Sequence, residues 1–335
     1  MRAKVVTFAS PFKVELVEEE VREPGRGEVL VESLYSLIST GTEMTAYAGS
    51  FPQGSAWASY VRYPFKPGYS NVGRVIKVGE GVSQLVEGDI VVSDAPHTEF
   101  YVWPAERLVR VPEGVRSEEA TFHTLGGGVM NCVRFAGVRL GESVVVVGAG
   151  LLGQLVIQFS RLSGGFPIIA VDLSDYRLKL AKESGADEVV NPEREGVFEA
   201  VGRVTRGRMA DVVFEVTGNP DVLPQAIRMA RRMGRLIVLS SPRGPTTLDF
   251  HDEVNAPSRI IIGTHFYTLH PEVETLHYPW TWRRDRELFL EMLRAGRVRV
   301  GHLISHVIPF ERAREAYEML YSRRLECMGV VLEYQ

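Results

Sequence analysis

The sequence predicts an α/β fold in which a small β-rich unit is joined to a doubly wound parallel sheet covered by helices. Two observations lead to this prediction. Over the first 110 or so residues, β-branched runs alternate with turn signals rich in Gly, Pro, Asn and Asp. From about residue 120, buried-type apolar runs alternate with helical segments, which is typical of a parallel sheet wrapped by helices.

Seven short strands are expected in the first part of the chain, because each apolar run there is bounded by turn residues. They are residues 3–9, 13–19, 27–36, 71–79, 89–93, 99–104 and 107–112. Six further strands would complete a dinucleotide-binding sheet. They lie within residues 143–164, 167–186, 187–192, 209–234, 235–241 and 258–264.

The last part of the chain is expected to return to the first domain. An irregular aromatic stretch at residues 265–282 precedes a helix at 283–296, and residues 298–334 have strand, helix, strand texture. We therefore expect one domain of residues 1–119 and 264–335, and a second of residues 120–263. With 335 residues, the chain is long enough to bury a core in each.

Composition excludes several classes of function. The net charge of -4 gives no basic surface for a phosphate backbone, so we expect no nucleic-acid partner. The longest apolar run, Val144 to Phe159, is interrupted by glycines and glutamines, so we expect no membrane partner and a cytoplasmic protein. Cys132 and Cys327 form neither a CxxC pair nor a disulfide framework and are expected to be buried, reduced thiols.

The glycines at residues 148–153, Gly-Ala-Gly-Leu-Leu-Gly, form a G-x-G-x-x-G motif directly after the strand at Val144 to Val147. Alone, the motif could reflect glycine packing, but here it opens a helix. Gly148 allows the tight turn, Gly150 lets a pyrophosphate approach N–H groups at the helix N-terminus, and Gly153 permits close helix packing. The context predicts a dinucleotide site.

Asp172 ends the next strand, about 20 residues after the motif, where an acidic side chain accepts hydrogen bonds from the adenosine ribose. It would repel a 2′-phosphate, which selects NAD over NADP; the alternative is a helix-capping role. Arg177 either covers the ribose or is a solvated helix arginine. The expected cofactor-binding residues are Gly148, Gly150, Leu152, Gly153, Asp172, Arg177 and Thr217.

This order of domains, with the motifs at residues 67–82, 88–92, 97–115, 135–153 and 216–220, resembles the medium-chain dehydrogenase/reductase superfamily of the zinc alcohol and polyol dehydrogenase type. The resemblance implies a GroES-like catalytic domain, a Rossmann NAD-binding domain and a small-molecule substrate in the cleft between them. It also implies a homodimer or homotetramer joined across a sheet edge.

In zinc-bearing relatives the catalytic metal has three protein ligands, at positions that match Thr40, Tyr69 with Ser70 beside it, and Thr124. Zinc sites use thiolate, imidazole or carboxylate donors, so we expect no metal here. The cysteine-rich lobe of a structural zinc is also missing. The chain is most similar to a zinc-less branch that includes bacteriochlorophyllide hydroxyethyl dehydrogenases and sugar or cyclitol dehydrogenase-like proteins.

Without zinc to stabilise an alkoxide, protein groups must handle the proton. The candidates are Thr42, which matches the relatives' proton-relay hydroxyl, together with Tyr69 and His123; Thr40 could add a hydrogen bond. The ordinary pKa of histidine, about 6.5, favours His123 over a tyrosine near 10, although a buried structural histidine is an equal alternative. Structural roles are expected for Glu43 and His97.

The leading hypothesis is an NAD-dependent, zinc-independent oxidoreductase acting on a secondary alcohol of the polyol, sugar or cyclitol type. The aromatic stretch around His265 to Trp282 would suit stacking on a substrate ring, although packing is the default role. The alternatives are a zinc-free quinone or enoyl reductase of the same superfamily, against which Asp172 and the glycine turn count, and a non-catalytic dinucleotide-sensing protein.

Overall fold

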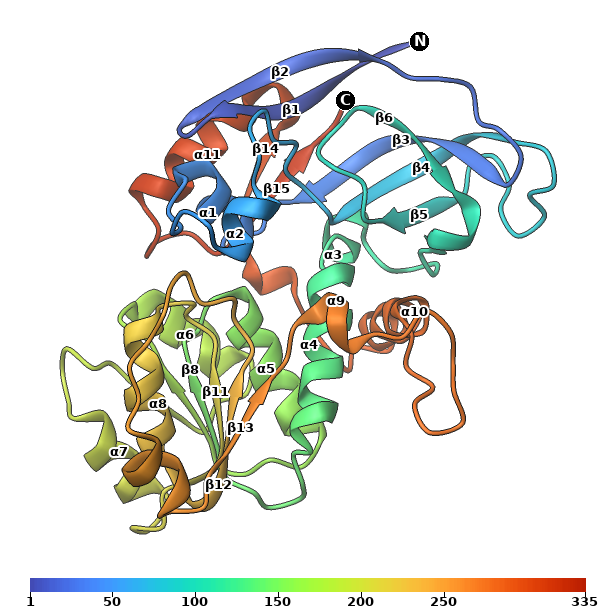
Figure 1. Ribbon diagram of the computed structural model, residues 1–335. Helices are drawn as coiled ribbons and strands as arrows, with labels where there is room; N and C mark the ends of the chain where they lie inside the picture. Colours follow the sequence, from blue (N-terminus) through green and yellow to red (C-terminus); the bar gives the residue numbers. More distant parts are fainter. The chain divides into compact units, whose positions relative to one another are not determined.

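The computed structural model describes residues 1–335, apart from the side chain of Tyr267. The chain divides into two compact units (Figure 1). Unit 1 joins residues 1–127 to residues 282–335, and unit 2 comprises residues 128–281. Both borders lie later in the chain than the expected borders at 119/120 and 263/264.

The first border falls inside helix α4 (His123–Ala136). A Cβ on Gly126 would overlap the ring of Phe289 in unit 1, and a Cβ on Gly128 would overlap the ring of Phe266 in unit 2. Glycine therefore lets each half of this helix pack closely within its own unit. For this reason the border between the units lies inside α4, and not before it as expected.

The second border is displaced because residues 264–281 pack on α4 within unit 2. Asn131 Nδ2 donates a hydrogen bond to the carbonyl of Leu269, and the Arg134 guanidinium lies 3.7 Å from the centre of the Trp280 ring. The segment that was expected to belong to the first domain is thus held by the second half of α4.

Unit 1 contains two sheets. Its larger sheet has the strand order β14-β15-β3-β4-β5-β7, with β6 also paired to β3, and only β14 and β15 run parallel. The smaller sheet is the antiparallel hairpin β1-β2. The strands are β1 (Arg2–Ser10), β2 (Lys13–Glu20), β3 (Glu28–Leu37), β4 (Asn71–Val78), β5 (Ile90–Ser93), β6 (Phe100–Pro104), β7 (Val109–Arg110), β14 (Ile304–Pro309) and β15 (Gly329–Glu333).

The C-terminal segment joins unit 1 as expected, because β15 pairs with β3 in the centre of the larger sheet. Tyr317 and Phe8 are fully buried in a common core, where their rings meet edge to face with centres 4.9 Å apart. The helices are α1 (Thr42–Ala48), α2 (Ala56–Tyr60), α3 (Ser117–Ala120), α10 (Trp282–Arg294) and α11 (Ala313–Ser322), with 3₁₀ turns at Ala105–Arg107, Gly301–Leu303 and Phe310–Arg312.

Unit 2 is the predicted doubly wound fold. Six parallel strands take the order β10-β9-β8-β11-β12-β13. Because helices cover the sheet, its central strand is buried throughout, and Val144 to Val147 are at most 6% exposed (Figure 1). The strands are β8 (Val144–Val147), β9 (Ile168–Val171), β10 (Glu188–Val190), β11 (Ala210–Glu215), β12 (Ala230–Val238) and β13 (Ile260–Gly263).

The helices of unit 2 connect these strands and complete its core. They are α5 (Leu151–Leu162), α6 (Asp175–Glu183), α7 (Val197–Val204), α8 (Leu223–Met229) and α9 (Phe266–Leu269), with a 3₁₀ turn at Pro220–Val222 and a π-helical turn at His251–Asn255. One element differs from the sequence prediction: β12 begins at Ala230, directly after α8, whereas this strand was expected only within residues 235–241. Met233 there adopts a φ of 57°, which no helix contains.

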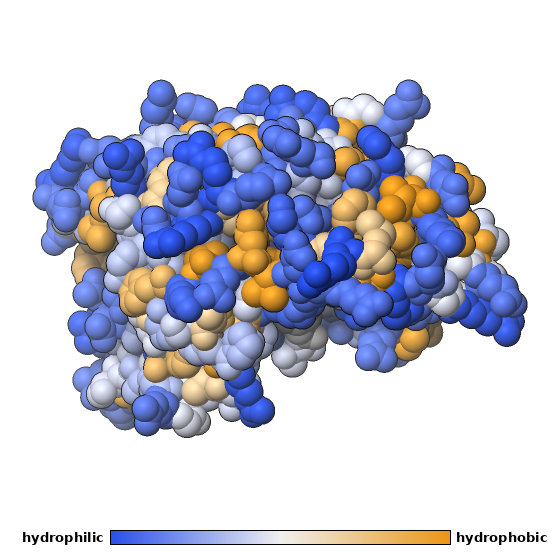
Figure 2. All heavy atoms as spheres, turned by 90° about the horizontal axis from the view of Figure 1, so that it is seen from above, coloured by the Kyte–Doolittle hydropathy of each residue, from blue (hydrophilic) through white to orange (hydrophobic). Residues whose placement is uncertain are grey.

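The surface drawn in Figure 2 is mainly hydrophilic, and its apolar residues are scattered in small groups. Among the described residues, no helix combines the length and the apolar composition that crossing a bilayer requires. Cys132 and Cys327 are buried, and neither forms a disulfide, as expected.

Candidate functional site

The glycine turn after β8 leaves room for a ligand at one of its glycines only. Gly148 has a φ of 101°, and a Cβ on Gly153 would lie 2.0 Å from the carbonyl oxygen of Gly148. A Cβ on Gly150, in contrast, would meet no atom within 4 Å. Gly148 and Gly153 are therefore needed by the fold itself, whereas the missing side chain of Gly150 keeps the N-terminus of α5 open to a phosphate.

Asp172 holds the glycine turn as well as standing at the expected ribose position. Its two carboxylate oxygens accept hydrogen bonds from the N–H groups of Ala149 (2.8 Å) and Ser174 (2.9 Å). Asp172 is half-buried, so part of the residue stays in contact with solvent. The open glycine, the helix N-terminus and this carboxylate fit the pyrophosphate and adenosine ribose of a dinucleotide.

The other expected cofactor residues lie around the same turn. Leu152 is half-buried in the first turn of α5, and Arg177 is half-buried in the first turn of α6. A Cβ on Gly148 would lie 3.0 Å from Thr217 Cγ2, so Thr217 packs against the turn. The structure thus brings all seven residues to the carboxyl edge of one sheet, around the ends of β8, β9 and β11.

In unit 1, the segment after β3 places the candidate hydroxyl groups next to a buried carboxylate. Thr40 and Thr42 are half-buried on either side of Gly41, the residue that precedes α1. Glu43 is 1% exposed, and its Oε1 accepts the N–H of Ser39 at 2.9 Å. The carboxylate therefore fixes the backbone of the loop that carries both threonines.

Two further donors saturate the Glu43 carboxylate. Tyr317 Oη donates to Glu43 Oε2 at 2.5 Å, and His97 Nε2 lies 3.0 Å from the same oxygen. Burial and the carboxylate itself raise the pKa of Tyr317 well above its ordinary value, so Tyr317 remains a donor. The structural role expected for Glu43 agrees with these contacts.

His97 continues the same network. Its Nδ1 lies 2.6 Å from Ser36 Oγ, which in turn lies 2.8 Å from the hydroxyl of Tyr334. Because an ionised carboxylate only accepts, His97 donates to Glu43 through Nε2, and in its neutral form it accepts from Ser36 through Nδ1. His97 is fully buried with both ring nitrogens engaged, which agrees with the structural role expected for it.

Tyr69 stands at the edge of this network. Its hydroxyl donates to Ser39 Oγ at 2.5 Å, and its carbonyl accepts from Thr124 Oγ1 at 2.7 Å. The neighbouring Ser70 is 1% exposed. The structure therefore joins two of the positions that match zinc ligands in relatives, Tyr69 and Thr124, through a hydrogen bond between protein groups.

His123 is fully buried at the start of α4. The backbone of Ser93 and of Asn71 hydrogen-bonds its ring, and Arg286 is close enough to act on its charge. Burial, reinforced by the positive charge of Arg286, lowers the pKa of His123 well below its ordinary value. The ring is therefore neutral at neutral pH and is a weak base.

Several residues that are joined to Glu43 by hydrogen bonds, directly or through other side chains, were not expected from the sequence. They are Ser39, Tyr317 and Tyr334. Ser39 lies two residues after the end of β3 and resembles a turn residue, while Tyr317 and Tyr334 lie in the C-terminal segment. Ser39 hydrogen-bonds Tyr69, 30 residues further along the chain. Tyr317 and Tyr334 hydrogen-bond Glu43 and Ser36, which lie 274 and 298 residues away. No local pattern contains that information. The only available signal was the expectation that the C-terminal segment returns to the first domain.

The described residues contain no group of three or more His, Cys, Asp or Glu side chains placed to hold a metal ion. The positions that match zinc ligands present hydroxyl groups from Thr40, Tyr69, Ser70 and Thr124. Hydroxyl donors alone do not fit the donor set that zinc sites use.

The aromatic stretch at residues 265–282 is engaged mainly with α4. Tyr278 donates through its hydroxyl to Asn131 Oδ1, and its ring meets that of Phe135 at 73°, with centres 6.4 Å apart. His270 is buried, whereas His265 and His277 are exposed. The role of this stretch in substrate binding stays a prediction.

Comparison with known proteins identifies the family. A family model described as zinc-binding dehydrogenase matches residues 152–279. The L-threonine 3-dehydrogenase of Pyrococcus horikoshii is 30% identical, with 92% of each chain covered. The D-guloside 3-dehydrogenase of Escherichia coli K12 is 27% identical, with 94% of this chain and 95% of that protein covered.

A solved structure shows the same fold over nearly the whole chain. It is an alcohol dehydrogenase of Escherichia coli CFT073 complexed with the cofactor NADH, with a TM-score of 0.83 and 20% identity over 99% of each chain. The chain belongs to the medium-chain dehydrogenase/reductase superfamily of the zinc-binding type. Its relatives are dehydrogenases, and it is an oxidoreductase of the alcohol dehydrogenase kind.

Proposed function

We propose that this protein is an NAD-dependent, zinc-independent dehydrogenase that oxidises a secondary alcohol of the polyol, sugar or cyclitol type. The observation that carries the proposal is the pairing of a complete dinucleotide turn in unit 2 with hydroxyl side chains at every position that matches a zinc ligand in unit 1. The first feature supports hydride transfer to a nicotinamide. The second requires that protein groups take over the role of the metal.

The choice of NAD rests on Asp172. Its carboxylate, fixed by the N–H groups of Ala149 and Ser174, stands where the adenosine ribose hydroxyls would donate to it. A 2′-phosphate at the same place would bring two negative charges together. Bound NAD would supply the hydride acceptor, while Gly150 and the N-terminus of α5 would hold its pyrophosphate.

For the proton, the structure leads us to propose Tyr69 rather than His123. His123 is fully buried and its pKa is lowered, so it is poorly suited to accept a proton from an alcohol at neutral pH. Tyr69 is only half-buried, and its hydroxyl already donates to Ser39. In its deprotonated form, Tyr69 can take the proton of the substrate hydroxyl on its own phenol oxygen and release it to solvent later, while Thr42 and Thr40 orient the substrate hydroxyl.

The substrate class follows from the polarity of these groups. Thr40, Thr42, Ser39 and Tyr69 offer several hydroxyls in one segment of unit 1, which suits a molecule bearing several hydroxyls of its own. Two relatives that cover nearly the whole chain are, by name, 3-dehydrogenases of a hydroxy amino acid and of a sugar glycoside. A polar secondary alcohol is common to both names.

The experiment that tests the cofactor assignment is a fluorescence titration of the purified protein with NADH and with NADPH. We expect NADH to bind at least roughly 10-fold more tightly, because one bidentate set of ribose hydrogen bonds is exchanged for charge repulsion. Equal or tighter binding of NADPH would contradict the assignment.

A further inference from the structure

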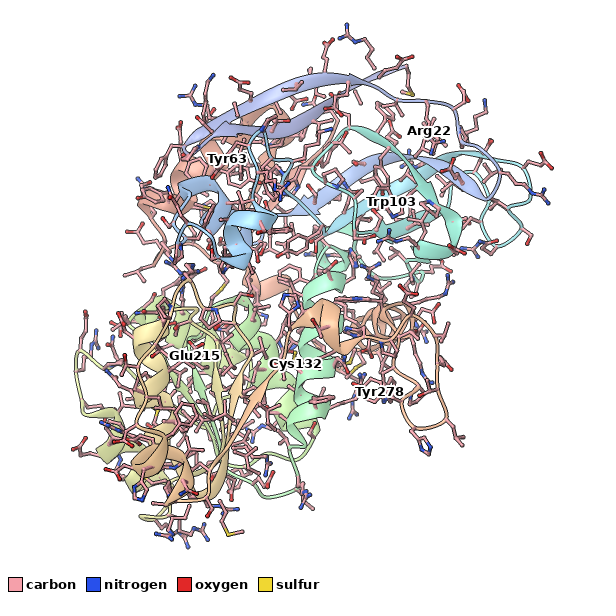
Figure 3. All side chains as sticks on the ribbon, in the orientation of Figure 1. Arg22, Tyr63, Trp103, Cys132, Glu215 and Tyr278 are labelled. Atoms are coloured by element: carbon pink, nitrogen blue, oxygen red, sulfur yellow. The ribbon has the colours of Figure 1, made fainter. Side chains whose placement is uncertain are left out.

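Glu215 is a fully buried carboxylate at the last position of β11, in the interior of unit 2 (Figure 3). Its Oε1 accepts from the N–H of Thr217 at 2.6 Å and from the hydroxyl of Thr217 at 2.5 Å. Its Oε2 accepts from the hydroxyl of Ser240 at 2.5 Å. Among the ion pairs of the described residues, none includes Glu215. The three donors to this buried carboxylate are therefore all neutral groups.

These bonds tie together the segments that follow two neighbouring strands. The backbone carbonyl of Glu215 accepts the N–H groups of Leu239 and Ser240, at 3.1 and 3.2 Å. A second link joins the same segments, because the carbonyl of Gly218 accepts the N–H of Arg243 at 3.2 Å. The segments after β11 and after β12 are thus fixed to one another at the carboxyl edge of the sheet, with Glu215 at their centre.

The same centre adjoins the glycine turn. A Cβ on Gly148 would lie 3.0 Å from Thr217 Cγ2 and 3.2 Å from the nitrogen of Thr217, so Thr217 packs directly on the turn. Thr217 is held there by Glu215 through both its N–H and its hydroxyl. A change at Glu215 would be transmitted to the turn through this one residue.

The strand order assigns the two halves of a dinucleotide to different strands. In a doubly wound sheet each half of the sheet binds one mononucleotide, and ligands lie beyond the carboxyl ends of the strands. Here β8, β9 and β10 form the half that carries Asp172, and β11, β12 and β13 form the other half. With the adenosine on the first half, the nicotinamide ribose falls on the segments that Glu215 fixes.

We propose that Glu215 is a positioning residue for the nicotinamide half of the cofactor, holding the segments after β11 and β12 in the arrangement that binds it. The inference rests on the proposed NAD function and extends it to a residue that touches no ligand. A carboxylate is needed because three donors converge on two oxygens. Glutamine would present an NH₂ group to at least one of those donors.

The test is a titration of the Glu215→Gln variant with two probes, NADH and ADP. ADP occupies only the adenosine and phosphate part of the site, so it reports on the first half of the sheet. We expect roughly 10-fold weaker NADH binding, the usual effect of losing hydrogen bonds to a charged group, and ADP binding within about 2-fold of the unsubstituted protein.

Two further variants complete the experiment. Glu253→Gln is the matched control: Glu253 is also buried in unit 2, but it pairs with Arg228 and Arg259, and Arg259 Nε donates to the carbonyl of Ala230, the first residue of β12. Glu253→Gln should leave the affinities for NADH and for ADP unchanged. Ser240→Ala removes a single donor and should show the same selective loss, to a smaller extent of about 3-fold. It tests the proposal if Glu215→Gln does not fold.

The outcomes separate this inference from the proposed function. A selective loss of NADH affinity in Glu215→Gln or Ser240→Ala supports it. Equal losses for NADH and ADP would show a general folding role and would overturn it, as would unchanged NADH binding in both variants. An unsubstituted protein that binds neither NADH nor ADP would overturn the proposed function and this inference together.

Discussion

Two strand-to-helix turns of the molecule use the same device in opposite surroundings. After β8, the N–H of Ala149 donates to Asp172; after β3, the N–H of Ser39 donates to Glu43. In each turn a carboxylate fixes the backbone between a strand and the following helix. The similarity ends with the space around that carboxylate.

The turn after β8, residues 148–153, has free space beside it, and we call it the open turn. The turn after β3, residues 38–43, is packed against other side chains, and we call it the filled turn. Gly150 has no atom within 4 Å of where a side chain would begin, and Asp172 is half-buried. Glu43, in contrast, is 1% exposed and accepts from Tyr317 and His97 as well as from Ser39. The first turn therefore leaves backbone groups and a carboxylate accessible, as the proposed cofactor site requires, whereas the second turn is packed around its carboxylate.

The largest expected effect concerns the filled turn. Tyr69→Phe removes only the hydroxyl that donates to Ser39, so we expect kcat to fall by about 100-fold or more, the usual contribution of a general acid or base. NADH affinity should stay unchanged, because the proposed cofactor contacts at Gly150, the N-terminus of α5 and Asp172 all lie in unit 2. Steady-state kinetics and a fluorescence titration measure both quantities. Near-normal turnover in Tyr69→Phe, with loss of turnover in His123→Gln, would return the role of base to His123.

The open turn gives the second comparison, between two glycines of one motif. Gly150→Ala should fold normally, since its methyl group meets no protein atom, but should bind NADH roughly 10-fold more weakly because that methyl group blocks the pyrophosphate. Gly153→Ala places a carbon 2.0 Å from the Gly148 oxygen and should lower the free energy of unfolding by about 1–3 kcal/mol.

Urea denaturation and NADH titration of both glycine variants measure these effects. A Gly150→Ala protein with unchanged NADH affinity would show that the space at this glycine is not the pyrophosphate site. A Gly153→Ala protein as stable as the parent would show that α5 can move away from the turn, so that the glycine is not a requirement of the fold.

The smallest expected effect is the pH dependence contributed by His123. Its pKa is lowered in the folded state, so below the ordinary value of about 6.5 the unfolded chain binds a proton that the folded chain does not. The stabilisation is complete above about pH 6.5 and decreases by at most about 1.4 kcal/mol per pH unit as the pH falls toward the folded pKa.

The measurement is the free energy of unfolding as a function of pH for the parent and for His123→Gln. The difference between the two curves should slope below pH 6.5 and be flat above it. His251→Gln is the control, because the His251 side chain is 76% exposed. It shows how replacing a histidine by glutamine changes the free energy of unfolding when no burial is involved. Parallel curves for the parent and His123→Gln would mean that the folded ring accepts its proton as readily as the unfolded one.

The parts of the molecule that depend on local patterns were predictable from the sequence. The glycine turn, Asp172 and the six strands of unit 2 each follow from a short run of residues, because period, glycine position and strand length are local properties. The φ of 101° at Gly148 and the close approach of Gly153 to the Gly148 carbonyl oxygen agree with the tight turn and the close packing expected at these two glycines. The start of β12 at Ala230 was missed because a helix-forming composition there is overridden by pairing with Ala210 of β11.

The parts that depend on distant pairing were not predictable. Glu215 stands in the sequence as an ordinary acidic residue at a strand end, and its partner Ser240 lies on the far side of α8. Glu43 meets Tyr317 only once the C-terminal segment joins unit 1. His123 shows the same limit, because its residue type suggested a base, while its burial beside Arg286 depends on the packing of α4 and α10.

The central claim is that hydroxyl groups have replaced the metal in the filled turn, and the most direct test is the zinc content of the purified protein after mild dialysis. The account predicts much less than one zinc per chain, because Thr40, Tyr69, Ser70 and Thr124 offer no thiolate, imidazole or carboxylate to hold it. One tightly bound zinc per chain would contradict it and would mean that other side chains assemble a metal site in the working enzyme.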